Sequence, residues 1–204
     1  MNKVFNKSLK WSTGIAVITL VLAAIFSVVS TLSLEGVNWA AGMIIVFMIV
    51  LIGVIFDIIG VAATAADEVP FHAMASEKVK GSRQAIAISR NADRVASFCN
   101  DVIGDISGII SGTASAVVIV QLTDAFGGDD ATAFQYIVSI VFTSVVAALT
   151  VGGKAFGKSF AIHFSTSIIF QVGRVIYFFE ERLKLKQLIS QPARTKFKRN
   201  TKGK

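Results

Sequence analysis

Long runs of apolar residues alternate with short polar segments along the 204-residue chain. Four of these runs, at residues 12–34, 40–66, 97–122 and 134–151, carry few charges and are separated by turns or by charged segments. A helix rises about 1.5 Å per residue, so about 20 apolar residues cross the hydrocarbon core of a bilayer. The pattern therefore predicts an all-α polytopic membrane protein with four transmembrane helices.

The first apolar run has a second interpretation, as a secretory signal peptide. A signal peptide has an apolar core of about 7 to 15 residues, followed by a cleavage site of small residues. The run at residues 12–34 is longer than that. Its length favours a retained first transmembrane helix, preceded by a cytoplasmic N-terminus at residues 1–11 and opening a transmembrane domain at 12–152.

A polar segment at residues 67–98 separates the second and third apolar runs. It contains five basic residues, and Pro70 interrupts it near its start. We expect this segment to be cytoplasmic and to form short helices over 76–89 and again from Asn91.

Residues 159–179 form a fifth apolar stretch that His163, Gln171 and Arg174 interrupt. Because a crossing here would carry the basic C-terminus to the outside, we interpret the stretch as an interfacial or re-entrant helix. It belongs to a predicted group of juxtamembrane helices at 153–190. The remaining residues, 191–204, have the composition of a basic disordered tail.

Lysine and arginine are confined to one side of the predicted helices. The N-terminal segment holds 3 of them, the segment 67–98 holds 5, and the chain after residue 151 holds 12, which accounts for all 20. The two opposite loops hold none, as the positive-inside rule requires. This distribution predicts a multi-pass protein of the cell membrane with both termini in the cytoplasm. Beside a bilayer, the basic tail favours attraction to anionic headgroups over nucleic-acid binding.

The composition agrees with a membrane protein and excludes several other classes. The chain is 53% hydrophobic and 16% charged, with a mean hydropathy of +0.67. Its single cysteine, Cys99, excludes an intrachain disulfide framework. The sequence has no Gly-rich phosphate loop, no nucleophile–base pair and no Cys/His cluster, so we expect neither an enzyme nor an organic cofactor.

Three aspartates within the apolar runs are the candidates for chemistry. Asp101 and Asp105 are four residues apart and share one helix face, while Asp57 lies in the preceding run. Asp57 and Asp105 are each about 12 to 13 Å from the predicted cytoplasmic ends of their helices, so we expect the two carboxylates to face each other at similar depth within one pocket. Neither run contains Lys or Arg. Acids in such a place are either protonated or neutralised by a bound cation.

Oxygen-bearing side chains surround these acids in the sequence. Carboxylate, amide and hydroxyl oxygens suit Mg²⁺, Ca²⁺ or Mn²⁺ better than Zn²⁺. The candidate metal ligands are Asp57, Asn100, Asp101, Asp105, Ser107 and Ser111.

Glycines at every fourth position accompany the acids, at Gly104, Gly108 and Gly112. Such a row lets another helix approach closely. A purely structural interpretation stays open for the acids as well. Asp101 would then favour the helix dipole near an N-terminus, and Asp57 and Asp105 would be protonated and hydrogen-bonded between helices.

Two short segments resemble the cyclin M / CorB–CorC family of magnesium transporters. Asn91-Ala92-Asp93-Arg94-Val95 resembles the N-P-D-R-L that precedes a core membrane helix in that family, and Gly153-Lys154-Ala155-Phe156-Gly157-Lys158-Ser159 is similar to its G-E-I-I-P-K-S. The match covers about residues 47–173. The resemblance implies a dimeric membrane domain that handles magnesium through oxygen ligands from packed helices. It also implies a belt of juxtamembrane helices, to which residues 159–179 would belong.

The sequence departs from the family pattern at several positions. Lys154 stands where the family has Glu, and Gly157 stands where it has Pro. Residues 60–64 read GVAAT where a polar Ser/Glu turn is expected. Three membrane acids occur where the family mainly uses neutral polar groups.

The sequence thus predicts a divalent-cation transporter of the magnesium type, or the membrane domain of one. Its expected partners are the lipid bilayer, the cation and a second copy of the chain in a homodimer. Two alternatives remain open, a non-transporting membrane scaffold and a proton- or sodium-coupled carrier.

Overall fold

The computed structural model describes residues 2–128 and 131–182, which form helices and connecting turns without a β-strand. The elements in chain order are α1 (Asn2–Leu34), α2 (Trp39–Ala65), α3 (Val69–Ser76), α4 (Ser82–Arg90), α5 (Ala92–Ala96), the π-helix η1 (Ser97–Gly104), α6 (Asp105–Phe126), α7 (Ala131–His163) and α8 (Ser165–Arg182). The predicted all-α fold is confirmed.

Within the described residues, four stretches of helix are long and apolar enough to cross a membrane, at Trp11–Leu34, Trp39–Ala65, Ala92–Phe126 and Ala131–His163. Their number is the predicted one, and it is consistent with a membrane location. Two of the helices are longer than predicted. The third begins at Ala92 because α5, η1 and α6 follow one another without a break, and the fourth continues past residue 151 to His163.

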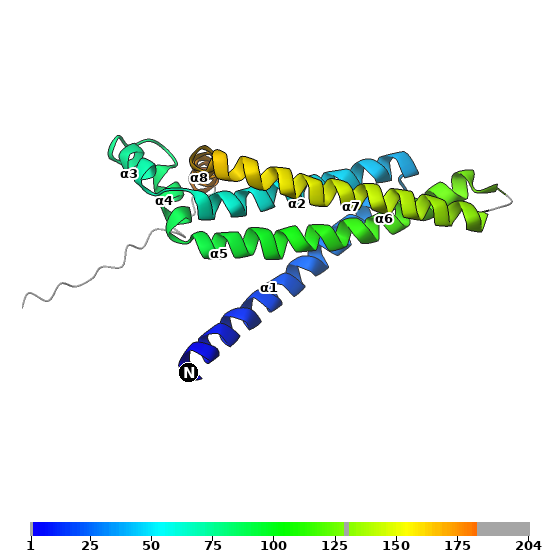
Figure 1. Cartoon of the computed structure of the whole chain (residues 1–204), viewed down its shortest axis with the longest axis horizontal. Coiled ribbons are helices and arrows are strands. Elements are labelled where there is room, and N and C mark those ends of the chain that lie inside the picture. The colour runs from blue at the N-terminus through cyan, green and yellow to red at the C-terminus, as the bar shows by residue number, and fades with distance from the viewer. Residues whose placement is uncertain (1, 129–130, 183–204) are drawn as a thin grey trace, which may run out of the picture.

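The bundle is built from α2, α7 and the continuous rod of α5, η1 and α6, which lie side by side (Figure 1). Apolar side chains of α2, α6 and α7 form its core, among them Val46, Val118 and Val146. Helix α1 leaves the bundle at an angle and contacts α6 through a small apolar cluster around Ile106 and Ile110.

Glycines set the distance between the helices of the bundle. A Cβ built on Gly53 of α2 would lie 2.8 Å from Cβ of Ser107, and one built on Gly157 of α7 would lie 2.6 Å from Cγ1 of Ile58. Only glycine permits such a close approach. By contrast, no atom of a neighbouring element lies within 4 Å of a Cβ built on Gly108 or Gly112.

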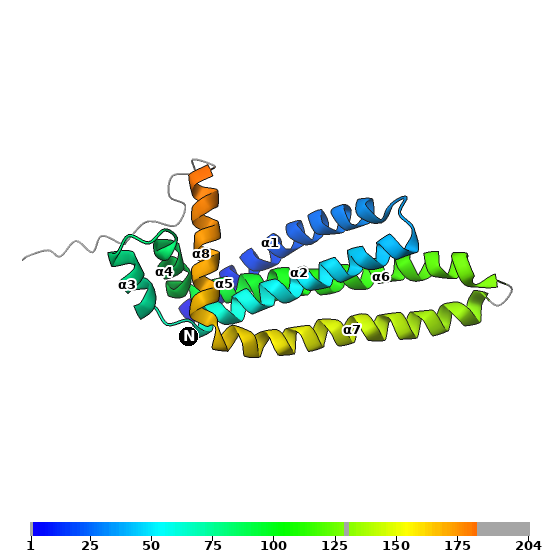
Figure 2. The ribbon, with the colours of Figure 1, turned by 90° about the horizontal axis from the view of Figure 1, so that it is seen from above.

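The short helices α3 and α4 and the longer α8 form a layer across one end of the bundle, which we call the end layer. Figure 2 shows α8 running across the bundle axis at a steep angle, with α3, α4 and the start of α1 at the same end. Phe71, Ala85 and Ile169 are fully buried between these helices. The layer is therefore packed onto the bundle through its own apolar core.

Local chain geometry corrects two predicted helices of this layer. The helix predicted over 76–89 begins only at Ser82, because Lys78 and Gly81 have φ of 57° and 92°, which breaks a right-handed helix. Residues 159–179 are not one helix. The chain turns at Phe164, so that the first part continues α7 and the second forms α8. Residues 183–190 and the predicted tail at 191–204 lie outside the described residues.

Candidate functional site

Among the described residues, Asp57 is the buried carboxylate of the bundle, with 5% of its surface exposed. It lies on the inner face of α2, whose buried row also includes Gly53 and Gly60. Its Oδ1 is 3.9 Å from Nζ of Lys154, and its Oδ2 has no hydrogen-bond partner among the described residues. A buried oxygen without a partner is costly, so this carboxylate is a candidate ligand.

Asn100 belongs to the π-helix η1 and lies against the face of α2 that also carries Asp57. A Cβ on Gly60, one turn after Asp57, would overlap Oδ1 of Asn100, so the amide lies directly against the α2 backbone. That Oδ1 is also buried without a partner among the described residues. π-Helical turns are rare and are found frequently at functional sites.

Small and polar residues face each other at three places where α2 meets η1 and α6, and apolar side chains such as Val46 and Val118 pack between the second and third of these places. Gly60 lies against Asn100, Gly53 against Ser107, and a Cβ on Gly42 would be 3.5 Å from Oε1 of Gln121. The Gln121 Oε1 is the third buried oxygen without a partner among the described residues. Positions 42 to 60 of a helix span about 27 Å, close to the thickness of a bilayer core of about 30 Å.

The remaining serines of α6 are satisfied within their own helix. Ser111 donates to the Gly108 carbonyl at 2.9 Å, and Ser115 donates to the Ser111 carbonyl at 2.6 Å. Ser107 and Ser111 are both buried. Ser107 is therefore the serine that lies closest to α2, while Ser111 serves mainly its own backbone.

Lys154 supplies the basic group that was expected to be missing. The second and third apolar runs contain no Lys or Arg, and from this we expected the acids to have no basic counter-ion. That expectation is wrong for Asp57, because a lysine of α7 reaches it in the folded bundle. Because α7 continues to His163, Lys154 lies on that helix, where Nζ is 3.4 Å from the Cβ position of Gly104 and 3.9 Å from Asp57. Gly153 and Gly157 flank it and bring α7 against α2.

Asp101 and Asp105 are both exposed, whereas Asp57 is buried, so the structure does not bring Asp105 and Asp57 together in one pocket as expected. Asp101 accepts a hydrogen bond from the Ser97 hydroxyl at 2.7 Å. The two acids share a face as predicted, but α6 buries the row of Ser107, Ser111 and Ser115 instead.

The six predicted ligands are thus divided between two faces. Asp57, Asn100, Ser107 and Ser111 belong to the inner one, and no three His, Cys, Asp or Glu side chains within residues 2–128 and 131–182 are placed to hold a metal ion. The inner face combines one carboxylate, one ammonium group and neutral oxygens, so it is close to electrically neutral. The two charged groups can form an internal ion pair, and a cation would have room beside Asp57 only if the ammonium moved away.

A second polar cluster, in the end layer, was not anticipated from the sequence. Glu68 Oε1 lies 2.6 Å from His72 Nε2 and 2.5 Å from Arg90 Nε, which ties α3 to α4. The hydrogen bonds from His72 and then Arg90 lower the pKa of Glu68 below its ordinary value. Only the i, i+4 spacing of Glu68 and His72 signalled this cluster in advance.

Comparisons with models of protein families, with curated proteins and with solved structures found no match to this chain.

Proposed function

We propose that this chain is an integral membrane protein that carries a cation through its helical bundle, with Asp57 as the central ligand and a divalent cation of the magnesium type as the substrate. Four helices cross the bilayer, both termini are cytoplasmic, and the end layer lies at the cytoplasmic face. In support of this orientation, the start of α1 lies at the same end of the bundle as the end layer.

One observation carries the choice of a cation. The carboxylate oxygen of Asp57 and the amide oxygen of Asn100 are both buried without hydrogen-bond partners among the described residues, on facing elements of one interface. Both atoms only accept hydrogen bonds or coordinate cations. Hard oxygen ligands of this kind match Mg²⁺, which is commonly held by one or two carboxylates together with water.

The neighbouring polar contacts mark the levels at which a cation on this path would meet oxygens. Asn100, Ser107 and Gln121 each lie beside a glycine of α2, and apolar side chains such as Val50 and Ala114 separate the last two levels. The exposed acids, Asp101 and Asp105, take no part in this path.

Lys154 acts as an internal competitor in this scheme. Its ammonium occupies the neighbourhood of Asp57 when no cation is bound and must move away when one arrives. The side chain is 25% exposed, and a lysine side chain has four rotatable bonds with which to withdraw.

Flux into proteoliposomes tests the transport function directly. We expect Mg²⁺ uptake by the wild type and at least tenfold slower uptake by Asp57→Asn, which loses the charge but keeps the shape. Asp105→Asn is the matched control on the outer face and should transport at the wild-type rate. Uptake that is unchanged in Asp57→Asn would contradict the assigned site, and uptake that follows a proton or sodium gradient without a Mg²⁺ effect would identify the coupled carrier.

A membrane scaffold is the second candidate function, and the Asp57–Lys154 pair favours it. In a scaffold the pair is a permanent link between α2 and α7, and the neutral site holds no ion. Mg²⁺ would then leave the thermal midpoint of the wild type in detergent unchanged, whereas a transporter is stabilised as the cation binds its folded state.

The homodimer is proposed to use the outer face of α6. Asp105, Gly108 and Gly112 are exposed there, and no atom of a neighbouring element lies within 4 Å of a Cβ built on either glycine. A carboxylate at this position is costly against lipid, so a second copy that covers it is favoured.

A further inference from the structure

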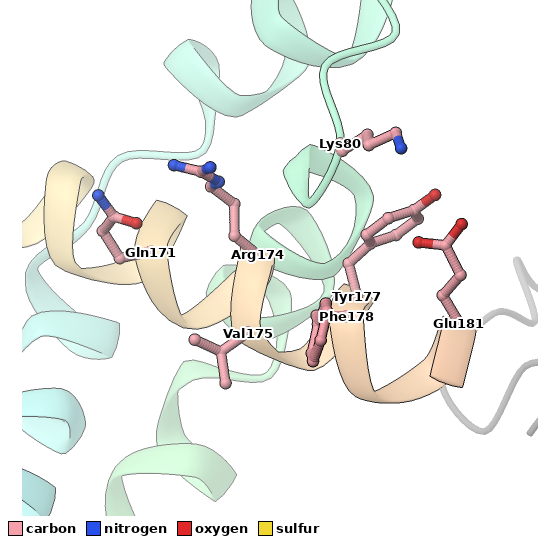
Figure 3. A pocket seen from close by; sticks show the side chains of 7 residues that line it. All are labelled: Lys80, Gln171, Arg174, Val175, Tyr177, Phe178 and Glu181. Atoms are coloured by element: carbon pink, nitrogen blue, oxygen red, sulfur yellow. The ribbon is translucent and has the colours of Figure 1, made fainter. Parts of the chain in front are cut away.

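A pocket of about 440 Å³ lies in the end layer, away from Asp57 and the bundle interior. One face of α8 and the loop before α4 form its walls, as Figure 3 shows. The residues that line it are Lys80, Gln171, Arg174, Val175, Tyr177, Phe178 and Glu181.

Close backbone contact fixes the shape of this pocket. Gly81, with φ of 92°, is the N-cap residue directly before α4, and a Cβ built on it would lie 2.8 Å from backbone atoms of Arg174. A Cβ on Gly173 would in turn lie 2.6 Å from the Gly81 carbonyl oxygen. The loop that carries Lys80 is therefore held directly against the turn of α8 that carries Arg174.

The pocket has two polar ends and an apolar wall. Arg174 and Gln171 lie at one end, while Lys80 and Glu181 lie beside Tyr177 at the other (Figure 3). Nζ of Lys80 is 5.7 Å from the centre of the Tyr177 ring. Neither Lys80 nor Arg174 has an ion-pair partner within the described parts of the chain.

The second carboxylate on this stretch of α8 is already engaged elsewhere. Glu180 accepts a hydrogen bond from Nε2 of Gln84 at 2.7 Å, on the side of α8 that faces α4. Among the residues that line the pocket, Glu181 is the carboxylate that would repel an anion, and it lies at the Lys80 end. The Arg174 end, where guanidinium and amide donors are together, is therefore the end that attracts an anion.

We propose that this pocket binds the phosphate group of an amphiphilic ligand, namely the headgroup of an anionic phospholipid. Arg174 and Gln171 hold the phosphate, Lys80 adds a second positive charge, and Val175 and Phe178 contact the carbon portion. In support, α8 begins directly after the last helix that is long enough to cross a membrane and turns across the bundle end. A basic site at that height meets headgroups. The inference requires the proposed membrane location but no transported ion.

Binding of short-chain lipids to the full chain in detergent tests this assignment. We expect dioctanoyl phosphatidylglycerol to raise the thermal midpoint and dioctanoyl phosphatidylcholine to have little effect. Arg174→Gln should weaken phosphatidylglycerol binding about fivefold, and Lys80→Gln by a similar factor, as for a basic residue near an anionic surface. Arg83→Gln and Lys78→Gln are the matched controls, because both residues are exposed nearby but do not line the pocket.

Each outcome of this experiment has a distinct meaning. Equal losses in Arg83→Gln and Arg174→Gln would overturn the site, because they would show general surface attraction. Equal binding of both lipids by the wild type would overturn it too. Glycerol 3-phosphate is the third probe: binding as tight as that of the lipid would assign the phosphate site to a soluble compound and overturn the lipid as its source. Arg174→Lys should recover most of the affinity, which separates a charge effect from misfolding. A normal lipid response together with absent Mg²⁺ flux would leave this site standing and contradict only the transport function.

Discussion

The rod of α5, η1 and α6 carries polar residues on an inner and an outer face that have different surroundings. On the inner face, Asn100 and Ser107 touch glycines of α2 and lie beside the buried Asp57 and the Lys154 ammonium. On the outer face, Asp105 and Gly108 are exposed, and no atom of a neighbouring element in the described part of the chain lies within 4 Å of a Cβ built on Gly108. The difference teaches that a polar row on a helix becomes a site only where another element closes over it.

The largest difference between the faces should appear when single acids are neutralised. Asp57→Asn leaves the Lys154 ammonium without its partner, which should cost about 2–3 kcal/mol, less than the about 3–5 kcal/mol of a fully buried pair because Lys154 is 25% exposed. Asp105→Asn should change the stability by less than about 0.5 kcal/mol. Unfolding in detergent, followed by thermal midpoint or denaturant titration, measures both.

The double variant Asp57→Asn/Lys154→Met is the control for this prediction. Because it removes both charges, its stability should return to within about 1 kcal/mol of the wild type. If the single and double variants are equally unstable, the two side chains are not coupled and the inner face is not organised around their pair.

Alanine substitutions of glycines should give a smaller difference in stability between the two faces than the neutralised acids do. Gly53→Ala places a methyl group 2.8 Å from Cβ of Ser107, so overpacking should cost about 1–3 kcal/mol. A Cβ on Gly108 meets no atom of a neighbouring element within 4 Å in the described part of the single chain, so Gly108→Ala should leave the stability of the monomer unchanged or raise it by up to about 1 kcal/mol, since alanine is the better helix former.

A larger side chain at Gly108 tests whether a second copy of the chain covers the outer face of α6. Gly108→Leu should leave the stability of the monomer unchanged but shift the oligomeric state in detergent from dimer to monomer, as size-exclusion chromatography with light scattering would measure. A wild type that is monomeric in nanodiscs as well as in detergent would argue against the proposed homodimer.

The smallest effect is expected in the end layer, at the exposed Glu68 cluster. The pKa of Glu68 is lowered in the folded protein by His72 and Arg90, so its ionised form contributes stability above about pH 4.5 and that contribution is lost as the pH falls through the lowered value. Thermal midpoints of wild type and Glu68→Gln should therefore differ at pH 5.5 and converge toward pH 3. Glu77→Gln is the control, and high salt should reduce the difference.

Much of the fold was predictable because bilayer crossing depends on local composition. Inside a bilayer, a run of about 20 apolar residues forms a helix because no water is present to satisfy its backbone, so the number of long apolar helices followed from hydropathy alone. The ends of these helices were less predictable. Lys154 and Lys158 marked a boundary by charge, yet α7 continues through both, since helix propensity does not stop at a membrane surface.

The candidate site was predictable only in part. Asp57, Asn100 and Ser107 were identified from residue type, and they do lie on one interface. The exposed position of Asp101 and Asp105 could not be predicted, because periodicity tells which residues share a helix face but not which face turns toward the bundle. Lys154 was missed as a member of the site, since nothing in the spacing from residue 57 to residue 154 predicts that their side chains meet.

The sequence by itself determined the helical class, the number of long apolar helices and the residue types available for binding, because these depend on composition and on periods of a few residues. Only the tertiary structure decided that Lys154 reaches Asp57, that the row of Asp101 and Asp105 faces outward, and that Arg174 meets the Lys80 loop. These are contacts between segments far apart in the chain. They are settled by which glycines allow two backbones to approach, and no local pattern contains that information.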